Sequence, residues 1–199
     1  MPAEDAISDL RRDFSRMSAT FLPSGVGVWR RVLFALGNSE LHCVAAYRFG
    51  RYARGCRRRG ELVWIPLTIL HRIWNRWITH MHHCDISTRA MIGPGMLLMH
   101  RTGVIIGPAQ IGDDVVLHQN VTIGQRVAGG NQGVPHIGAG VWIGPNAVLS
   151  GPISVGDRAT VSAGSVLLRD APARALVGGV PARVLMMEYD NSAMTGVTT

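Results

Sequence analysis

The chain has 199 residues and a formal net charge of +7, and its 20 basic side chains are all arginine. A chain of this length fits one domain of moderate size with a small appendage. Three cysteines without a scaffold-like spacing argue against a disulfide framework and favour a reducing compartment.

The sequence predicts neither secretion nor a membrane span. Residues 1–20 have mixed charge and lack an apolar stretch, so we expect no secretory signal. The longest nearly apolar run, Leu62–Leu70, is shorter than the roughly 20 residues that a membrane helix needs. We therefore expect a cytoplasmic protein.

The first part of the chain has the patterns of helices. Apolar residues three or four positions apart predict a short amphipathic helix over Ala3–Met17. Two longer helical stretches are predicted over residues 29–59, with a weak point at Gly37–Ser39, and over residues 61–80. Ser39 precedes an acidic residue and an apolar run, so it is the expected start of a helix after the weak point.

This helical part is rich in tryptophan and arginine, including the run Arg57–Arg59. A basic helix that carries tryptophan can lie on an anionic membrane, which would place the protein peripherally at the inner membrane surface. The alternative, which we favour, is that the aromatic residues pack helices or subunits together and cover an open end of the repeat described next. We expect no nucleic acid partner, because no helix-turn-helix, zinc or aromatic-basic RNA motif is present.

From Ile86 onward an aliphatic residue recurs at every sixth position, and glycine follows many of these residues. This period matches neither a helix nor an alternating strand. Hexapeptide repeats predict a parallel β-helix, in which three hexads close one triangular coil and stacked coils bury a narrow core. The marked positions give roughly four coils: Ile86, Ile92, Leu98, Val104, Ile111, Leu117, Ile123, Ile137, Ile143, Leu149, Val155, Val161 and Leu167.

The repeat divides the chain into three expected parts. They are an N-terminal helical region over residues 1–82, a mainly β region with the β-helix over 83–175, and a C-terminal segment over 176–199. The repeat is interrupted at 124–136, between Ile123 and Ile137. An excursion from a rigid rod is by default a binding loop.

The stretch from Asp85 to Gly107 resembles the active-site stretch of the serine O-acetyltransferases and of their shorter relatives in surface-polysaccharide gene clusters. Tyr47-Arg48 and the sequence Gly-Val-Pro-Ala-Arg at 179–183 extend this resemblance over about residues 40–185. Both groups are hexapeptide-repeat acyltransferases. The resemblance implies a left-handed parallel β-helix, acetyl-CoA as the donor, direct transfer from thioester to hydroxyl, and a homotrimer whose loops reach over sites between subunits.

His100 and Asp85 are the expected catalytic pair. An imidazole can accept a proton from an alcohol near neutral pH and return it to a leaving thiolate. Asp85 lies fifteen residues before His100, close to one coil of 18, so the two could meet on neighbouring strands. A carboxylate there would fix the tautomer of the imidazole and stabilise its protonated form.

Departures from the serine O-acetyltransferase pattern concern the acceptor. In the serine O-acetyltransferases an acidic residue directly precedes the catalytic histidine, and the corresponding residue here is Met99. Their loop carries an Arg-His pair just before a proline that aligns with Pro135, and the corresponding residues here are Gly133 and Val134. A further acidic residue in the helical domain of those enzymes has no counterpart among Ser24–Val28 in this sequence. Because an amino acid brings two charges that such residues would hold, we expect a sugar hydroxyl in surface polysaccharide or glycoconjugate synthesis. L-serine is the alternative acceptor, and a non-catalytic scaffold is a third hypothesis.

Two further histidines lie near the acceptor side of the repeat. His118 could line the acceptor cleft, although an exposed turn position is the preferred expectation. His136 lies one place beyond the matching proline, so the role of the family's loop histidine is not assigned to it.

The resemblance also suggests where the donor binds. The pantetheine would pass Ser162-Ala163-Gly164, with Arg169 or Arg183 near the nucleotide phosphates. An equal alternative is that these arginines are solvated at the rim and bind no ligand.

The run His80–Asp85 contains several ligand types for a metal. Adjacent residues point in different directions, so we expect no metal.

Overall fold

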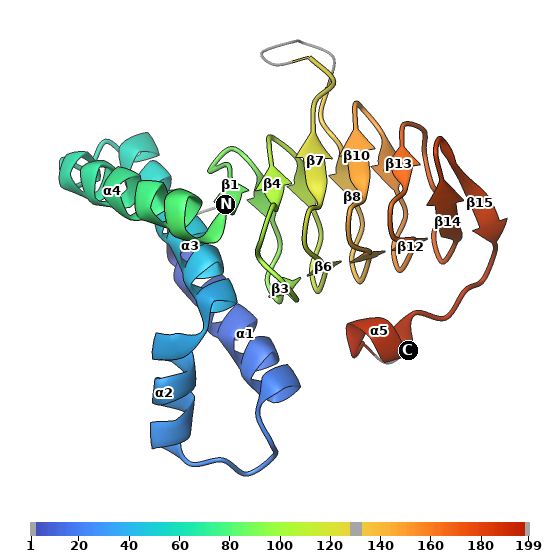
Figure 1. The fold of residues 1–199 in the computed structure, drawn as a ribbon. Coiled ribbons are helices and arrows are strands. Elements are labelled where there is room, and N and C mark those ends of the chain that lie inside the picture. Colours follow the sequence, from blue (N-terminus) through green and yellow to red (C-terminus); the bar gives the residue numbers. More distant parts are fainter. Residues whose placement is uncertain (1–2, 128–132, 198–199) are drawn as a thin grey trace.

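The computed structural model describes residues 3–127 and 133–197. Helices form the first part and a rod of short strands forms the second (Figure 1). The helices are α1 (Ala3–Phe21), α2 (Val28–Gly37), α3 (Ser39–Arg58) and α4 (Trp64–His82). The first helix is therefore longer than predicted.

The stretch predicted over residues 29–59 is two helices that separate at Asn38. The carboxamide oxygen of Asn38 accepts a hydrogen bond from the Leu41 N–H at 2.7 Å, and Asn38 has the extended backbone of an N-cap. The prediction of Ser39 as the first residue of a new helix is correct, but the capping side chain is the one before it.

The strands form three sheets, and each of the first four coils contributes one strand to each sheet. Sheet A contains β1 (Asp85–Ile86), β4 (Ile105–Ile106), β7 (Thr122–Gly124), β10 (Val148–Ser150) and β13 (Val166–Leu167). Sheet B contains β2 (Met91–Ile92), β5 (Gln110–Ile111), β8 (His136–Ile137) and β11 (Ser154–Val155). Sheet C contains β3 (Leu97–Leu98), β6 (Val116–Leu117), β9 (Trp142–Ile143), β12 (Thr160–Val161), β14 (Leu176–Gly179) and β15 (Ala182–Met186).

The pairing within the sheets is parallel up to β14, so the predicted parallel β-helix is confirmed. The aliphatic residues that mark the hexads are buried and stack into one core along the rod. After the interruption the coils have the predicted length, since Val148 pairs with Val166 eighteen residues later.

The predicted register is wrong at one position. Val104 is buried, but the inward residue of strand β4 is Ile106. The first coil is longer than 18 residues, because Asp85 pairs with Ile105 twenty residues later. The extra residues lie in the turn before β4, where the Gly103 N–H donates to the carbonyl of His83 at 2.8 Å.

Helices α1, α3 and α4 contact strands of the first coil and cover that end of the core. The Tyr47 hydroxyl donates to the carbonyl of Ala90 at 3.0 Å and accepts from the Ile92 N–H at 3.1 Å. Arg48 is buried and donates to the carbonyls of Ile92 and Gly93, each at 2.7 Å. The Tyr47-Arg48 pair thus attaches α3 to the rod.

The other end of the rod differs from the expected boundary at residue 175. Sheet C continues through β14, which is parallel to β12, and closes with the antiparallel strand β15. A short helix, α5 (Ser192–Thr195), follows in the C-terminal segment. The β structure therefore extends into the segment that was expected to follow it.

Candidate functional site

One corner of the rod collects several of the residues that the sequence singled out. It consists of the turns that lead from sheet C into sheet A, and we call it the C–A corner. Met99, His118, Gly144 and Ser162 follow strands β3, β6, β9 and β12 at equivalent positions, because each donates its N–H to the strand of the next coil. Neighbouring strands lie about 4.8 Å apart, so Met99 and Ser162 are separated by roughly 14 Å along the rod.

His100 is exposed at the first of these turns. The next residue, Arg101, donates from Nε to His82 Nδ1 at 3.0 Å and from Nη1 to Glu40 Oε1 at 3.1 Å. Glu40 lies at the start of α3 and His82 at the end of α4. The helical part therefore fixes the turn that carries His100.

His118 lies between two aromatic rings. Its ring centroid is 6.3 Å from that of His100 and 4.9 Å from that of Trp142, with edge-to-face angles in both cases. The sequence favours an exposed turn position for His118, but the structure shows that it is half-buried. Burial, followed by the nearby charge of His100, lowers the pKa of His118. Trp142 is not identifiable as a site residue from the sequence, because nothing in its strand distinguishes an outward aromatic residue.

Asp85 lies at the corner where the first coil begins, and His100 lies where that coil returns to the same corner. Asp85 is exposed, as is His100. Among the described residues, no hydrogen bond or ion pair joins these two side chains. The topology thus brings the two residues to one corner, and their pairing remains a prediction.

The interruption at 124–136 extends from the last residue of β7 to the first residue of β8, and residues 128–132 fall outside the described residues. Gly133 has φ of +84°, a conformation that side chains with a Cβ rarely adopt. Its carbonyl accepts from Gln125 Nε2 at 3.2 Å. The positive φ is therefore a local structural reason for glycine at position 133. Val134 and Met99 are both half-buried.

A cavity of about 340 Å³ at the far end of the rod brings together three arginines. Arg169 and Arg183 were expected to lie near a phosphate, and Arg126 joins them with its Nη2 donating to the carbonyl of Leu168 at 2.9 Å. Strands β13, β14 and β15 contact one another here, and β14 is the neighbour of the strand before Ser162. Ser162 is half-buried, whereas Ala163 and Gly164 are exposed in the turn that follows.

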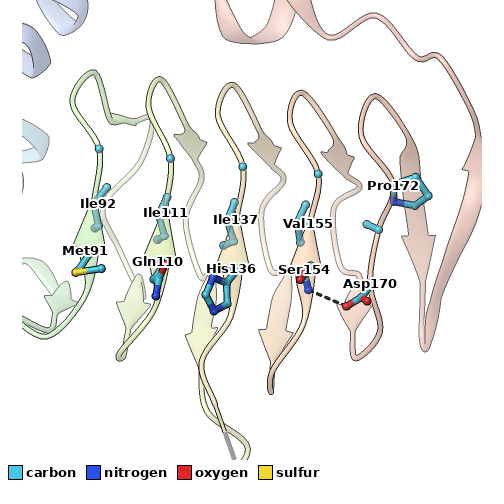
Figure 2. A pocket seen from close by; sticks show the side chains of 15 residues that line it. Met91, Ile92, Gln110, Ile111, His136, Ile137, Ser154, Val155, Asp170 and Pro172 are labelled. Carbon is cyan, nitrogen blue, oxygen red and sulfur yellow. Dashed lines mark hydrogen bonds between the residues drawn. The ribbon is translucent and has the colours of Figure 1, made fainter.

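A larger open groove of about 700 Å³ follows the outer face of sheet B (Figure 2). His136 lies in this groove beside Gln110, and the Ser154 N–H donates to Asp170 at 2.8 Å. His136 is therefore on a different face from His100. In the part of the chain that the structure describes, no group of three or more histidine, cysteine or acidic side chains is arranged to hold a metal.

Comparison with known proteins places this geometry in a family. The model of the bacterial transferase hexapeptide family (six repeats) matches residues 135–169. Serine acetyltransferase of Escherichia coli (strain K12) is 34% identical over 145 residues, which cover 72% of this chain and 50% of that protein. The solved soybean serine acetyltransferase complexed with serine has 31% identity and a TM-score of 0.73, over 92% of this chain and 70% of that chain. The chain belongs to the serine acetyltransferase family.

A further solved serine acetyltransferase, in complex with CoA, aligns with a TM-score of 0.71 and 28% identity over 92% of this chain and 70% of that chain. This chain spans about half the length of the curated serine acetyltransferases that it matches. The similarity to the E. coli enzyme covers more of the chain than the matched hexapeptide repeats do.

Proposed function

We propose that this chain is an O-acetyltransferase that moves an acetyl group from acetyl-CoA to the hydroxyl of L-serine. The observation that carries the proposal is the C–A corner, where the exposed His100 directly follows Met99, and Met99 lies in register with Ser162 along the rod. Solved relatives hold serine or CoA. These comparisons reverse the order expected from the sequence, which preferred a sugar hydroxyl.

The corner fits an extended donor. Beyond His118 the equivalent positions are Gly144 and Ser162, so the row of side chains becomes small toward the far end. The three arginines at that end supply charge for the nucleotide phosphates. Bound acetyl-CoA supplies an activated acetyl thioester, and we infer that Ser162-Ala163-Gly164 line the pantetheine while Arg126, Arg169 and Arg183 hold its charged end.

His100 is the general base of the proposed reaction. Its imidazole takes the proton of the acceptor hydroxyl while the hydroxyl oxygen bonds to the thioester carbon. The carbon–sulfur bond then breaks, and the protonated imidazole gives the same proton to the departing thiolate. The products are an acetyl ester and a thiol, without an acyl-enzyme, and Asp85 orients the imidazole and stabilises its charge.

The assembly belongs to the same proposal. We infer a left-handed sense for the coils and a homotrimer, because both are implied by the resemblance to the hexapeptide-repeat acyltransferases. The trimer would bring a neighbouring subunit against His100, with the loop at 124–136 reaching over the site. A cytoplasmic location is consistent with three free, buried cysteines.

The catalytic assignment is tested by release of CoA thiol from acetyl-CoA in the presence of L-serine. We expect His100→Ala to lower kcat about 10²–10⁴-fold, the usual contribution of general acid–base catalysis. His80→Ala is the control, since His80 is exposed on α4. Full turnover by His100→Ala would refute the assignment, and absence of CoA binding in calorimetry would favour a non-catalytic scaffold.

A sugar hydroxyl is the second candidate acceptor, in the manner of the short relatives from surface-polysaccharide gene clusters. It is favoured by Met99 and Val134, which are apolar and half-buried where charges would hold an amino acid. An acceptor screen separates the candidates. A kcat/KM for L-serine of about 10⁴ M⁻¹s⁻¹ or above supports serine, whereas a low value that Met99→Asp raises supports the sugar.

A further inference from the structure

Helix α4 has two apolar faces, one buried and one exposed. Ile78 is buried against the rest of the protein, with Leu67 and Trp74 half-buried on the same face. A second face carries an exposed row at every fourth position, which we call the α4 stripe: Ile65, Ile69, Ile73, Trp77 and Met81. At 1.5 Å per residue the stripe is about 24 Å long. Exposed apolar surface of this extent marks an interaction site.

The stripe is bordered by positive charge. Arg72 and Arg76 are exposed on α4 next to it, and Arg57 and Arg58 are exposed where α3 ends close to the start of α4. The Arg57 guanidinium lies 5.0 Å from the Trp64 ring. Helix α4 itself contains no acidic residue.

The charge of the whole chain is concentrated in this region. Residues 22–83 contain ten arginines and two acidic residues, a formal charge of +8, whereas the complete chain carries +7. The remaining residues therefore have almost no net charge. Figure 1 shows α4 at the end of the molecule opposite β15. The charged and apolar surface is thus at one end of the molecule.

We propose that the α4 stripe docks the protein on an anionic lipid surface, with α4 lying in the plane of the interface. Apolar side chains, tryptophan included, on a basic helix are the features of such interfacial helices, and each arginine near an anionic surface adds to binding. No helix in the described ranges is long and apolar enough to cross a membrane.

A second copy of the chain is the competing occupant, and the charge argues against it. Two copies that met through this surface would bring together the exposed arginines that border each stripe, Arg57, Arg58, Arg72 and Arg76, and like charges in contact oppose association. An anionic lipid surface instead complements both the arginines and the apolar side chains. Docking through the α4 stripe does not depend on which acceptor is acetylated, so this proposal does not rest on the proposed reaction.

The test is co-sedimentation of the full chain with vesicles of equal parts phosphatidylcholine and phosphatidylglycerol, compared with vesicles of phosphatidylcholine alone. We expect binding to the anionic vesicles that weakens at high salt. Arg72→Gln with Arg76→Gln should lower the partition coefficient about 30-fold. Ile69→Ser with Ile73→Ser should lower it about tenfold, since these side chains are 54% and 64% exposed and support no core.

The matched control is Leu185→Ser with Met187→Ser. These residues are 62% and 53% exposed at the other end of the molecule, and their replacement should leave vesicle binding unchanged. Equal binding to both vesicle types, or loss of binding in the control, would overturn the proposal.

Sedimentation equilibrium without lipid provides the second measurement. A lower oligomer mass in Ile69→Ser with Ile73→Ser, together with no vesicle binding by the unaltered chain, would assign the stripe to a second copy.

Discussion

The environment of His118 determines which form of its imidazole the folded protein favours. Burial between Trp142 and His100 and the nearby charge of His100 lower its pKa. We expect a titration midpoint below the ordinary value of about 6.5, measured by NMR of labelled imidazoles. His100→Ala should raise the pKa of His118, because it removes the charge. A midpoint at or above the ordinary value would contradict the described packing.

The same shift predicts a direction for stability. Because the folded pKa lies below the unfolded one, the unfolded state binds more protons in the window between them. The contribution of His118 to stability is complete above about pH 6.5 and falls as the pH drops through this window. Urea unfolding from pH 7.5 to 5.5 should therefore show a smaller loss of stability for His118→Gln than for the unaltered chain.

The sequence predicts individual site residues only where a local pattern identifies them. His100 and Asp85 were named from the stretch around them, and both lie at the C–A corner. Arg126 and Trp142 could not be named in this way. Arg126 approaches Arg169 and Arg183 through coil stacking, and Trp142 meets His118 across neighbouring strands.

At the scale of elements, Asn38 decides where α3 begins. Its side chain accepts a hydrogen bond from the Leu41 N–H, whereas no capping bond of the Ser39 side chain is recorded among the described residues. We expect Asn38→Ala to lower the free energy of unfolding by about 1 kcal/mol. Ser39→Ala is the matched control and should change it by less than about half that amount. The reverse order in urea unfolding would restore Ser39 as the cap.

The attachment of the helices to the rod depends on a buried ion pair. Arg48 Nε donates to Asp13 at 2.8 Å, and Asp13 also accepts from the N–H groups of Gly95 and Met96. Arg48→Met would remove the cation that pairs with the buried Asp13 carboxylate, so we expect a loss of about 3–5 kcal/mol. Arg48→Met with Asp13→Asn should be less destabilised than Arg48→Met alone. Arg51→Met is the control, since the Arg51 side chain donates to the carbonyl of Thr88 at a long distance of 3.4 Å.

The elements were more predictable from sequence than their registers. The hexads fix which residues face the core, because every coil repeats the same burial pattern. The pattern failed at Val104 because three consecutive aliphatic residues, 104–106, allow more than one register. Only the turn that reaches back to His83 selects Ile106. Local patterns therefore predict strands, and contacts between coils decide their alignment.

At the scale of the whole molecule, the C-terminal segment ties successive coils together. It follows the corner where sheet B leads into sheet C. The Tyr189 N–H donates to the carbonyl of Arg174, and the buried Asn191 side chain donates to the carbonyls of Gly140 and Arg158 at 3.0 and 3.1 Å. Arg16 of α1 donates to the carbonyl of Thr195 and so joins this segment to the helical part.

We expect Asn191→Ala to loosen this segment, because the two coils lose their shared donor. The loss of two hydrogen bonds should cost about 1–3 kcal/mol, which corresponds to a decrease in Tm of roughly 2–10 °C for a chain of this size. Limited proteolysis should also cut the segment after β15 faster. Met194→Ser is the control, because Met194 is 41% exposed on the same short helix. If Asn191→Ala changed neither Tm nor the cleavage rate, the hydrogen bonds of the Asn191 side chain would contribute nothing to the stability of the rod.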